Sequence, residues 1–305
     1  MPRSVRVRVP AKINLHLGVG PARPDGFHEL ETVFHAVSLY DDVTAGPGDG
    51  LTLTIEGEGA GELPTGPENL AIRAALVLAE YTGVAAEASI VLRKGIPVAG
   101  GMAGGSADAA ATLVACDALW GTALPRDELH DLAASLGSDV PFSLAGGTAL
   151  GTGRGELLTP VLAPRRRHWV IAVADGGLPT PDVYGELDRL RHRGAVPAAG
   201  PAEELLAALR DDNPAVLGAV LANDLQPAAL SLRPRLRRTL AAGLDEGALG
   251  ALVSGSGPTC VFLAADDDDA VELAATLAGL GVCRTVRTAY GPVPGARVIA
   301  EAERD

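Results

Sequence analysis

Aromatic residues, cysteines and long apolar runs are all scarce in this chain. Phe, Trp and Tyr together make up only 3% of its 305 residues, so each aromatic residue in a distinctive segment is informative. The three cysteines are far apart and form no C-x-x-C pair, which argues against a disulfide framework and a zinc site. No apolar run approaches the ~18 residues of a membrane-spanning helix, and the N-terminus lacks the apolar segment of a signal peptide. We therefore expect a cytoplasmic protein with reduced cysteines.

Positive charge is also in short supply. The chain has 25 Lys and Arg residues against 38 Asp and Glu residues, a net charge of −13. This balance argues against sequence-independent binding to nucleic acid or to an anionic membrane, because both need clustered cations. An anionic small-molecule substrate must instead meet local donors. The sequence leaves open whether the protein is a monomer or a homodimer.

The spacing of apolar residues predicts regular elements in the first half of the chain. Residues 3–9 alternate between valine and polar side chains, as a half-buried strand does. The same reasoning predicts strands at residues 3–9, 13–19, 33–39, 51–55 and 88–92, and helices at residues 70–81, 106–120 and 125–136. Mixed elements without regular βαβ alternation indicate the α+β class.

A charged interruption at residues 163–168 divides the chain into two parts of similar size. We predict an N-terminal domain of residues 1–163 and a C-terminal domain of residues 164–305, each long enough for its own core. In the second part, the patterns predict strands at residues 169–174, 251–263 and 282–286, and helical stretches at residues 202–240 and 269–280.

The glycine-rich segment KGIPVAGGMAGGSADAAAT, residues 94–112, is the most informative in the chain. Its glycines let successive backbone N–H groups turn toward one anion, and the helix predicted from Ser106 would point its positive end at the same place. The pattern matches neither the Walker loop nor the dinucleotide-binding fingerprint. It favours a phosphate-binding loop of another kind, with a tightly packed structural turn as the alternative.

Three segments carry a resemblance to a known family. PVAGGMAGGSADAA, residues 97–110, is similar to the second motif of the GHMP kinases, and LVSGSGPTCVFL, residues 252–263, resembles their third motif. PAKINLHLGVGPARPDGFHEL, residues 10–30, resembles the opening signature of the 4-diphosphocytidyl-2-C-methyl-D-erythritol kinases within that superfamily. The resemblance implies an ATP-binding N-terminal lobe like ribosomal-protein S5 domain 2, a ferredoxin-like C-terminal lobe, and an active site between them.

The resemblance also implies an activity. It is ATP-dependent phosphorylation of the 2-hydroxyl of 4-diphosphocytidyl-2-C-methyl-D-erythritol, giving the 2-phosphate and ADP, in the non-mevalonate pathway to isopentenyl diphosphate. ATP is the co-substrate and would bring Mg²⁺ with it. The alternatives are another small-alcohol kinase of the superfamily, a decarboxylase acting through a phosphorylated intermediate, and a catalytically silent nucleotide-binding protein.

Two residues are candidates for catalysis. Lys12 has apolar neighbours, and Asp139 lies in an apolar segment, where a carboxylate is costly unless it is paired or working. The alternatives are a surface lysine at a strand end and an aspartate that caps a turn. The resemblance implies that Asp139 takes the proton of the substrate hydroxyl and that Lys12 is hydrogen-bonded to it.

The resemblance assigns the two ends of the site. The nucleotide-binding positions implied or inferred are Asn69, Lys94, Pro97, Gly100, Gly101, Met102, Ala103, Gly104, Gly105 and Ser106. Asn69 could also be only the N-cap of the helix that follows it.

The acidic run at residues 266–269 is better explained as a helix N-terminus than as a metal site. No dedicated carboxylate for Mg²⁺ is evident, and Ser106 and Asp139 are the only nearby candidates.

For the cytidyl substrate, the positions are Asn14, Phe27, His28, Asp139, Thr180 and Tyr184. Phe27 stands where the family usually has tyrosine, so the ring that would stack on cytosine is kept and its hydroxyl is lost. Tyr184 would lie on the opposite face of the base, and His28 would hydrogen-bond it. Without the resemblance, Phe27 would be read as a core residue and His28 as a loop histidine.

Overall fold

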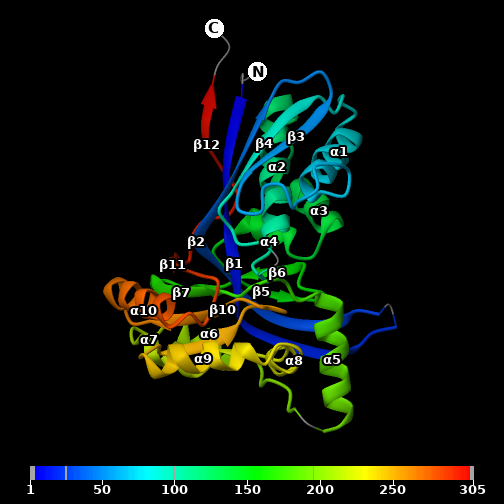
Figure 1. The fold of residues 1–305 in the computed structure, drawn as a ribbon. Coiled ribbons are helices and arrows are strands. Elements are labelled where there is room, and N and C mark those ends of the chain that lie inside the picture. Colours follow the sequence, from blue (N-terminus) through cyan, green and yellow to red (C-terminus); the bar gives the residue numbers. More distant parts are fainter. Residues whose placement is uncertain (1–3, 25, 99, 195, 303–305) are drawn as a thin grey trace.

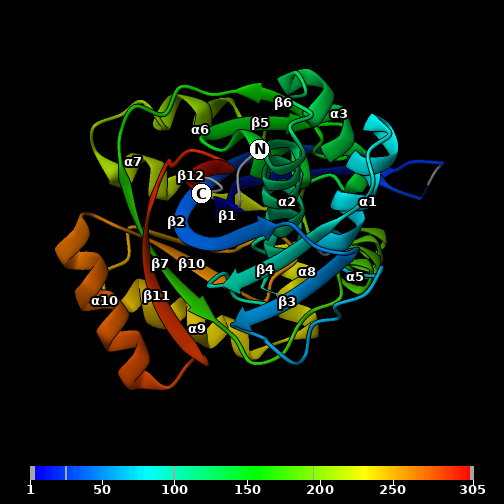
Figure 2. The same ribbon diagram turned by 90° about the horizontal axis from the view of Figure 1, so that it is seen from above.

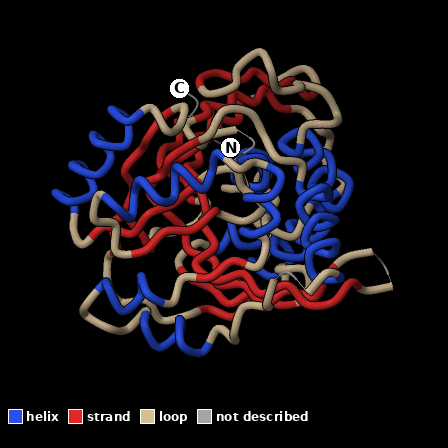
Figure 3. The backbone as a smooth tube through the Cα atoms, turned by 60° about the horizontal axis from the view of Figure 1, so that its bottom comes forward, coloured by secondary structure: helices blue, strands red, loops and turns tan. Residues whose placement is uncertain are grey.

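The computed structural model describes residues 4–24, 26–98, 100–194 and 196–302, which form two β-sheets flanked by helices (Figure 1). The first sheet has eight strands and the second has four. Most neighbouring strands are antiparallel, and helices blue in Figure 3 flank the central strands in red. The predicted α+β class with two lobes is confirmed.

Two long strands, β1 (Ser4–Ala22) and β2 (His28–Gly46), pair antiparallel along the middle of the first sheet. The prediction of separate strands at residues 3–9 and 13–19 was wrong, because both belong to β1. Pro10 cannot donate a hydrogen bond to the ladder, and the pairing register shifts just after it, so the strand continues through a bulge.

The remaining strands extend the first sheet on both sides. Its order is β12-β1-β2-β4-β3, with β5 beside β2, β6 beside β5, and β8 beside β1. Their bounds are β3 (Leu51–Gly57), β4 (Ala88–Lys94), β5 (Thr148–Thr152), β6 (Leu157–Pro160), β8 (Ala222–Asn223) and β12 (Arg297–Ala302). The predicted strands in the regions of β2, β3 and β4 are confirmed, with longer bounds.

Four helices belong to the part of the chain that builds the first sheet. They are α1 (Leu70–Thr82), α2 (Gly104–Trp120), α3 (Arg126–Leu136) and α4 (Val140–Ala145). Helix α2 contacts β1, β2 and α1, and its small buried alanines allow this close approach from several sides. The three helices predicted here are confirmed, although α2 begins at Gly104, two residues earlier than expected.

The second sheet is antiparallel, in the order β11-β7-β10-β9. Its strands are β7 (Arg167–Val173), β9 (Gly250–Val253), β10 (Cys260–Ala264) and β11 (Thr285–Gly291). A single strand at residues 251–263 was a wrong prediction, because β9 and β10 form a hairpin. Gly255 and Gly257, with φ of 56° and 81°, supply the left-handed conformations that reverse the chain between them.

Six helices accompany the second sheet: α5 (Thr180–His192), α6 (Glu203–Ala208), α7 (Pro214–Ala219), α8 (Gln226–Leu232), α9 (Arg235–Asp245) and α10 (Asp267–Leu280). Helices α9 and α10 contact its strands. The continuous helical stretch predicted at residues 202–240 was wrong. Prolines stand at or near the starts of α7, α8 and α9, where the first turn of a helix tolerates them, and they interrupt a continuous helix.

The second part of the chain crosses back over the predicted domain boundary at residues 163 and 164 to join the first sheet. The chain enters the second sheet with β7 and later returns to the first sheet. There β8 pairs with one end of β1, and β12 pairs with the other end of β1. Figures 1 and 2 both show β12 beside β1. The boundary itself stays a prediction, but the second part of the chain contributes two strands to the first sheet.

The cysteines and the acidic run have structural surroundings. Cys116 and Cys260 are buried and unpaired, as expected, whereas Cys283 is half-buried. Asp266 caps α10, its side chain accepting from the Asp269 N–H at 2.9 Å, which agrees with the helix N-terminus interpretation. None of the described helices is long and apolar enough to cross a membrane.

We expect a loss of stability in mild acid from one buried histidine. His35 is fully buried, with its Nδ1 2.8 Å from the Thr148 hydroxyl, and burial lowers its pKa to about 3. The unfolded chain binds this proton below pH ~6.5 and the folded chain does not, so stability falls as pH falls through that window. At pH 4.5 the protonation of His35 in the unfolded chain lowers the free energy of unfolding by about 3 kcal/mol.

Urea unfolding of the wild type and of His35→Gln at pH 7 and pH 4.5 tests this prediction. Other acidic groups contribute equally to both proteins, so the difference between them isolates His35. The wild type should lose more stability between the two pH values than the variant does. Equal losses in the two proteins would contradict the assignment.

Candidate active site

Two cavities share the glycine-rich loop, since Gly101 and Ala103 line both of them. The larger cavity, about 990 Å³, is bounded by β1, β2, the start of α5 and the turn at residues 254–259. The smaller cavity, about 320 Å³, lies beside the start of α1 and the end of β4. This arrangement offers two compartments that meet at one loop.

The structure brings the sequence-predicted site residues together in these compartments. The smaller cavity is lined by Asn69, Lys94, Pro97, Gly100, Gly101, Met102, Ala103, Gly104 and Gly105. The larger one is lined by Lys12, Asn14, Phe27, His28, Ser106, Asp139, Thr180 and Tyr184. Their placement fits a nucleotide on one side of the loop and an acceptor on the other, while their individual roles stay predictions.

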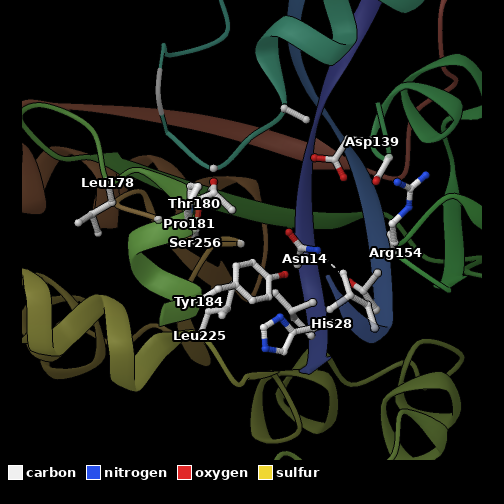
Figure 4. Close-up of a pocket in the computed structure, with 18 of the residues that line it drawn as sticks. Asn14, His28, Asp139, Arg154, Leu178, Thr180, Pro181, Tyr184, Leu225 and Ser256 are labelled. Atoms are coloured by element: carbon white, nitrogen blue, oxygen red, sulfur yellow. Dashed lines mark hydrogen bonds between the residues drawn. The ribbon is translucent and has the colours of Figure 1, made fainter. Parts of the chain in front are cut away.

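Lys12 and Asp139 form an ion pair in the larger cavity, with Nζ 3.5 Å from Oδ2. The Lys12 side chain is only 7% exposed, whereas that of Asp139 is 33% exposed. The lysine is therefore held inside the protein, and the carboxylate has an open side that faces the cavity (Figure 4). Lys12 lies in the interior of β1 and is buried, so the alternative of a surface lysine at a strand end is wrong.

A short chain of hydrogen bonds fixes the Lys12 ammonium. Its Nζ donates to Asn14 Oδ1 at 2.8 Å, Asn14 Nδ2 donates to the Thr32 hydroxyl at 2.8 Å, and Thr32 donates to the His16 carbonyl at 2.7 Å. Lys12 and Asn14 lie two residues apart on β1, so their side chains share one face. In this structure, Asn14 orients the lysine, in addition to lining the cavity.

Asp139 stands at the N-cap position of α4, but its side chain makes no capping hydrogen bond. The alternative interpretation of Asp139 as a cap is therefore not supported. Helix α4 begins directly after it with Val140 and Pro141, both buried, which anchor the backbone of the aspartate. The carboxylate is left free to act toward the cavity.

The glycine-rich loop has the special backbone conformations of an anion-binding turn. Gly101 has φ of 72°, and Ala103, the N-cap residue of α2, has φ of 58°. A left-handed alanine costs roughly 1–2 kcal/mol, so the surrounding structure must hold it there. Because the first N–H groups of an α-helix have no partner within the helix, the start of α2 presents donors beside both cavities.

The hairpin turn of the second sheet packs against the glycine-rich loop. A Cβ on Gly101 would lie only 2.3 Å from the Ser254 carbonyl oxygen, so no side chain fits there. The Ser254 hydroxyl donates to the Gly101 carbonyl at 3.2 Å, and the Lys12 N–H donates to the Met102 carbonyl at 3.3 Å. Gly255, Ser256 and Gly257 line the larger cavity, so the GSGP segment closes it from the second lobe.

Asn69 has a structural role whatever else it does. Its Oδ1 accepts from the Ala71 N–H at 2.9 Å, which caps α1, and its Nδ2 donates to the Pro64 carbonyl at 2.7 Å. The capping interpretation is confirmed. Because Asn69 also lines the smaller cavity, a contact with nucleotide remains compatible with this geometry.

The far end of the larger cavity contains an aromatic and acidic cluster. The ring centres of His28 and Tyr184 lie 5.0 Å apart (Figure 4). His28 Nε2 is 3.0 Å from Asp188 Oδ1. Burial raises the pKa of Tyr184, and the charge of Asp139 raises it further. Tyr184 and Asp188 are four residues apart on α5, so they share a helix face.

Phe27 is exposed at the cavity mouth, with 51% of its surface accessible. The Arg154 guanidinium lies 5.1 Å from the centre of its ring. An exposed ring on a cavity wall is available for stacking, so the interpretation of Phe27 as a core residue is wrong. Thr180 begins α5, and its hydroxyl is 3.0 Å from that of Ser256.

Several functional candidates were missed by sequence reasoning. Arg154 lines the same cavity as Asp139 (Figure 4), and a lone arginine between two glycines was the available signal. Asp188 could have been found from its spacing to Tyr184. Asp108, an acid in an alanine-rich helix, lines the smaller cavity. Asp41 gave no signal, because it follows a strand pattern and its partners are distant in sequence.

Comparisons with known proteins identify the family of this fold. Residues 69–147 match the model of the GHMP kinases N terminal domain, and residues 204–282 match that of the GHMP kinases C terminal domain. The structure is also similar to that of a homoserine kinase from Cytophaga hutchinsonii, with 21% identity, a TM-score of 0.75 and 98% of each chain covered. At this identity, the likeness shows the shared fold.

Similarities at higher identity are more specific. The chain is 67% identical to a 4-diphosphocytidyl-2-C-methyl-D-erythritol kinase of Salinispora tropica over 96% of this chain and 94% of the relative. It is 60% identical to the kinase of the same name from Nocardia farcinica, covering 98% and 97%. A crystal structure titled 4-(cytidine 5'-diphospho)-2C-methyl-D-erythritol kinase has 36% identity and a TM-score of 0.75, with 93% and 98% covered. The chain thus belongs to the 4-diphosphocytidyl-2-C-methyl-D-erythritol kinases, within the GHMP kinases.

Proposed function

We propose that this chain transfers the γ-phosphoryl group of ATP to the 2-hydroxyl of 4-diphosphocytidyl-2-C-methyl-D-erythritol, in the non-mevalonate pathway to isopentenyl diphosphate. The observation that carries this proposal is the Lys12–Asp139 pair, 3.5 Å apart, in a cavity that shares Gly101 and Ala103 with a second, smaller one. A kinase needs two bound substrates that meet at one catalytic group. Family membership supports the same reaction.

Asp139 is the base in this proposal, and Lys12 is its electrostatic partner. As the substrate oxygen attacks phosphorus, the hydroxyl proton passes to the open Asp139 carboxylate. The Lys12 ammonium offsets the negative charge that develops on the attacking oxygen, and Asn14 holds it in that place. Lys12 cannot swing away, because its side chain is almost completely buried.

The nucleotide would occupy the smaller cavity, with its phosphates against the loop and the start of α2. Backbone N–H groups there bind anions without requiring cationic side chains, which suits a chain of net charge −13. Mg²⁺ enters as part of this substrate and neutralises phosphate charge when bound. The Ser106 hydroxyl and the Asp139 carboxylate, on the wall of the larger cavity next to the shared loop, are hard oxygen donors that fit such an ion.

The cytidyl group would lie at the far end of the larger cavity. Phe27 and Tyr184 offer rings for stacking, each worth roughly 1–3 kcal/mol per base. If Asp188 accepts from the His28 Nε2–H, the neutral ring keeps Nδ1 as an acceptor for the amino group of cytosine. Arg154 and Thr180 add donors for the diphosphate and hydroxyl groups.

ADP release in the presence of Mg-ATP and alternative acceptors tests the proposal. Matched reactions contain the cytidyl-methylerythritol substrate, homoserine, mevalonate or no acceptor. We expect turnover with the cytidyl substrate alone. Turnover with homoserine or mevalonate instead would make the chain a different small-alcohol kinase, and ATP binding without turnover on any acceptor would make it a silent nucleotide-binding protein. A cytoplasmic location, where ATP is abundant, completes the proposal.

A further inference from the structure

Three buried charged residues lie behind the glycine-rich loop. Lys94, at the end of β4, donates from Nζ to Asp41 Oδ2 at 2.5 Å and to Asp108 Oδ2 at 2.7 Å. Asp41 lies on β2 and Asp108 in the second turn of α2. All three are less than 10% exposed, and Asp41 is completely buried. The charged triad thus joins two strands to the helix that follows the loop.

The triad is a costly feature of the core. Burying charges requires removing their hydration, and a buried ion pair often stabilises a protein no better than apolar residues would. Burial raises the pKa of Asp108, although Lys94 opposes this. For Lys94, burial lowers the pKa but the two carboxylates outweigh it, so its charge is kept. Stability alone is therefore a weak explanation for placing these groups here.

The contacts of the triad point to the loop itself. The second oxygen of Asp41 accepts the N–H groups of Gly95 and Ile96, at 2.7 and 2.9 Å, which are the first residues after β4. At the other end, a Cβ on Gly104 would lie 3.3 Å from the Lys94 ammonium. The described loop residues between these ends, 95–98 and 100–103, are thus held at their entry by the Asp41 carboxylate. The helix that follows them is anchored by the Lys94–Asp108 ion pair.

We propose that Asp41 is a positioning residue for the nucleotide, which holds loop residues 95–98 and 100–103 in their binding conformation through Lys94 and through the Gly95 and Ile96 amides. This deepens the proposed function and rests on it. Asp41 does not line either cavity, so it acts only through the residues it holds. A loop that is fixed before ATP arrives loses less entropy on binding.

Calorimetry on Asp41→Asn tests the proposal. The amide oxygen can still accept the two backbone N–H groups, but the ionic bond to Lys94 is lost. We expect the Kd for Mg-ATP, measured without acceptor, to rise about tenfold. A rise of this size corresponds to a loop that adopts its binding conformation only a tenth of the time. The Kd for the cytidyl substrate alone should change far less, because only Gly101, Ala103 and Ser106 of its cavity come from the glycine-rich segment. A general loss of structure would instead weaken the binding of both ligands.

Asp42→Asn is the matched control. Asp42 is the next residue on β2 and is also poorly exposed, but it pairs with Arg6 and Arg8, at 2.6 and 2.9 Å, away from the loop. Its variant should bind Mg-ATP like the wild type. Equal weakening in both variants, or unchanged ATP binding by folded Asp41→Asn, would overturn the proposal. Failure of the wild type to bind ATP at all would instead overturn the proposed function, and the inference with it.

A measurement on the wild type covers the case in which Asp41→Asn does not fold. With Asp41 holding them, the Gly95 and Ile96 amides should exchange with solvent as slowly as the amides inside β4, even without nucleotide. Fast exchange of these two amides in the ATP-free protein, with slow exchange in β4, would show that the loop is not held in advance and would refute the proposal.

Discussion

Asp139→Asn is expected to lower kcat by about 10²–10⁴, the usual contribution of a positioned general base. The amide has nearly the shape of the carboxylate, so the cavity keeps its form, but it cannot take up the substrate proton. It also leaves the buried Lys12 without its anionic partner. Binding of Mg-ATP in the smaller cavity should weaken far less than kcat falls, because Asp139 does not line that cavity and would meet the nucleotide only through Mg²⁺.

Single-turnover phosphoryl transfer, together with calorimetry for each substrate, separates these effects. Asp188→Asn is a suitable control, because Asp188 is a carboxylate of the same cavity that pairs with His28 instead of Lys12. That variant should change the KM for the cytidyl substrate far more than it changes kcat. If Asp139→Asn kept kcat within about threefold of the wild type, Asp139 could not be the base.

Lys12→Met is expected to lower kcat by about 10²–10³, the effect of removing one donor from a developing negative charge. Methionine fills most of the volume of the lysine side chain without its charge. The variant also leaves Asn14 Oδ1 without the hydrogen bond from Nζ. We expect weaker effects on the Kd of either substrate, because the ammonium is used chiefly in the transition state.

The double variant Lys12→Met with Asp139→Asn shows whether the two residues act as a unit. If they do, its kcat should be little lower than that of the worse single variant, since groups in one catalytic unit are not additive. Additive losses would mean that Lys12 and Asp139 work independently. Full activity of Lys12→Met would leave the ammonium with a structural role only.

Much of the site could be predicted from sequence because its residues belong to short motifs. The glycines at residues 100–105 follow from local backbone chemistry, since only small residues allow the turns and the contact of Gly101 with Ser254. Apolar neighbours made Lys12 and Asp139 candidates, but only motif resemblance paired them and gave each a role. The structure places them 3.5 Å apart.

The features that could not be predicted depend on partners far away in the chain. Asp41 looks like any polar residue on a strand until Lys94 and Asp108 are seen beside it. The continuity of β1 past Pro10 depends on pairing with β2, which tolerates a bulge there. The segment at residues 251–263 resembles one strand by its apolar content, but its two halves, β9 and β10, pair with each other, so the chain reverses within it.

The pairing of β12 with β1 has a consequence for synthesis on the ribosome. One edge of β1 is covered by residues 297–302, which are translated almost three hundred residues after it. Until they emerge, a nascent chain exposes the N–H and C=O groups of that edge, which are a template for wrong pairing. The upper part of the first sheet is therefore completed only after nearly the whole described chain has been made, so this protein cannot finish its first lobe before it begins its second.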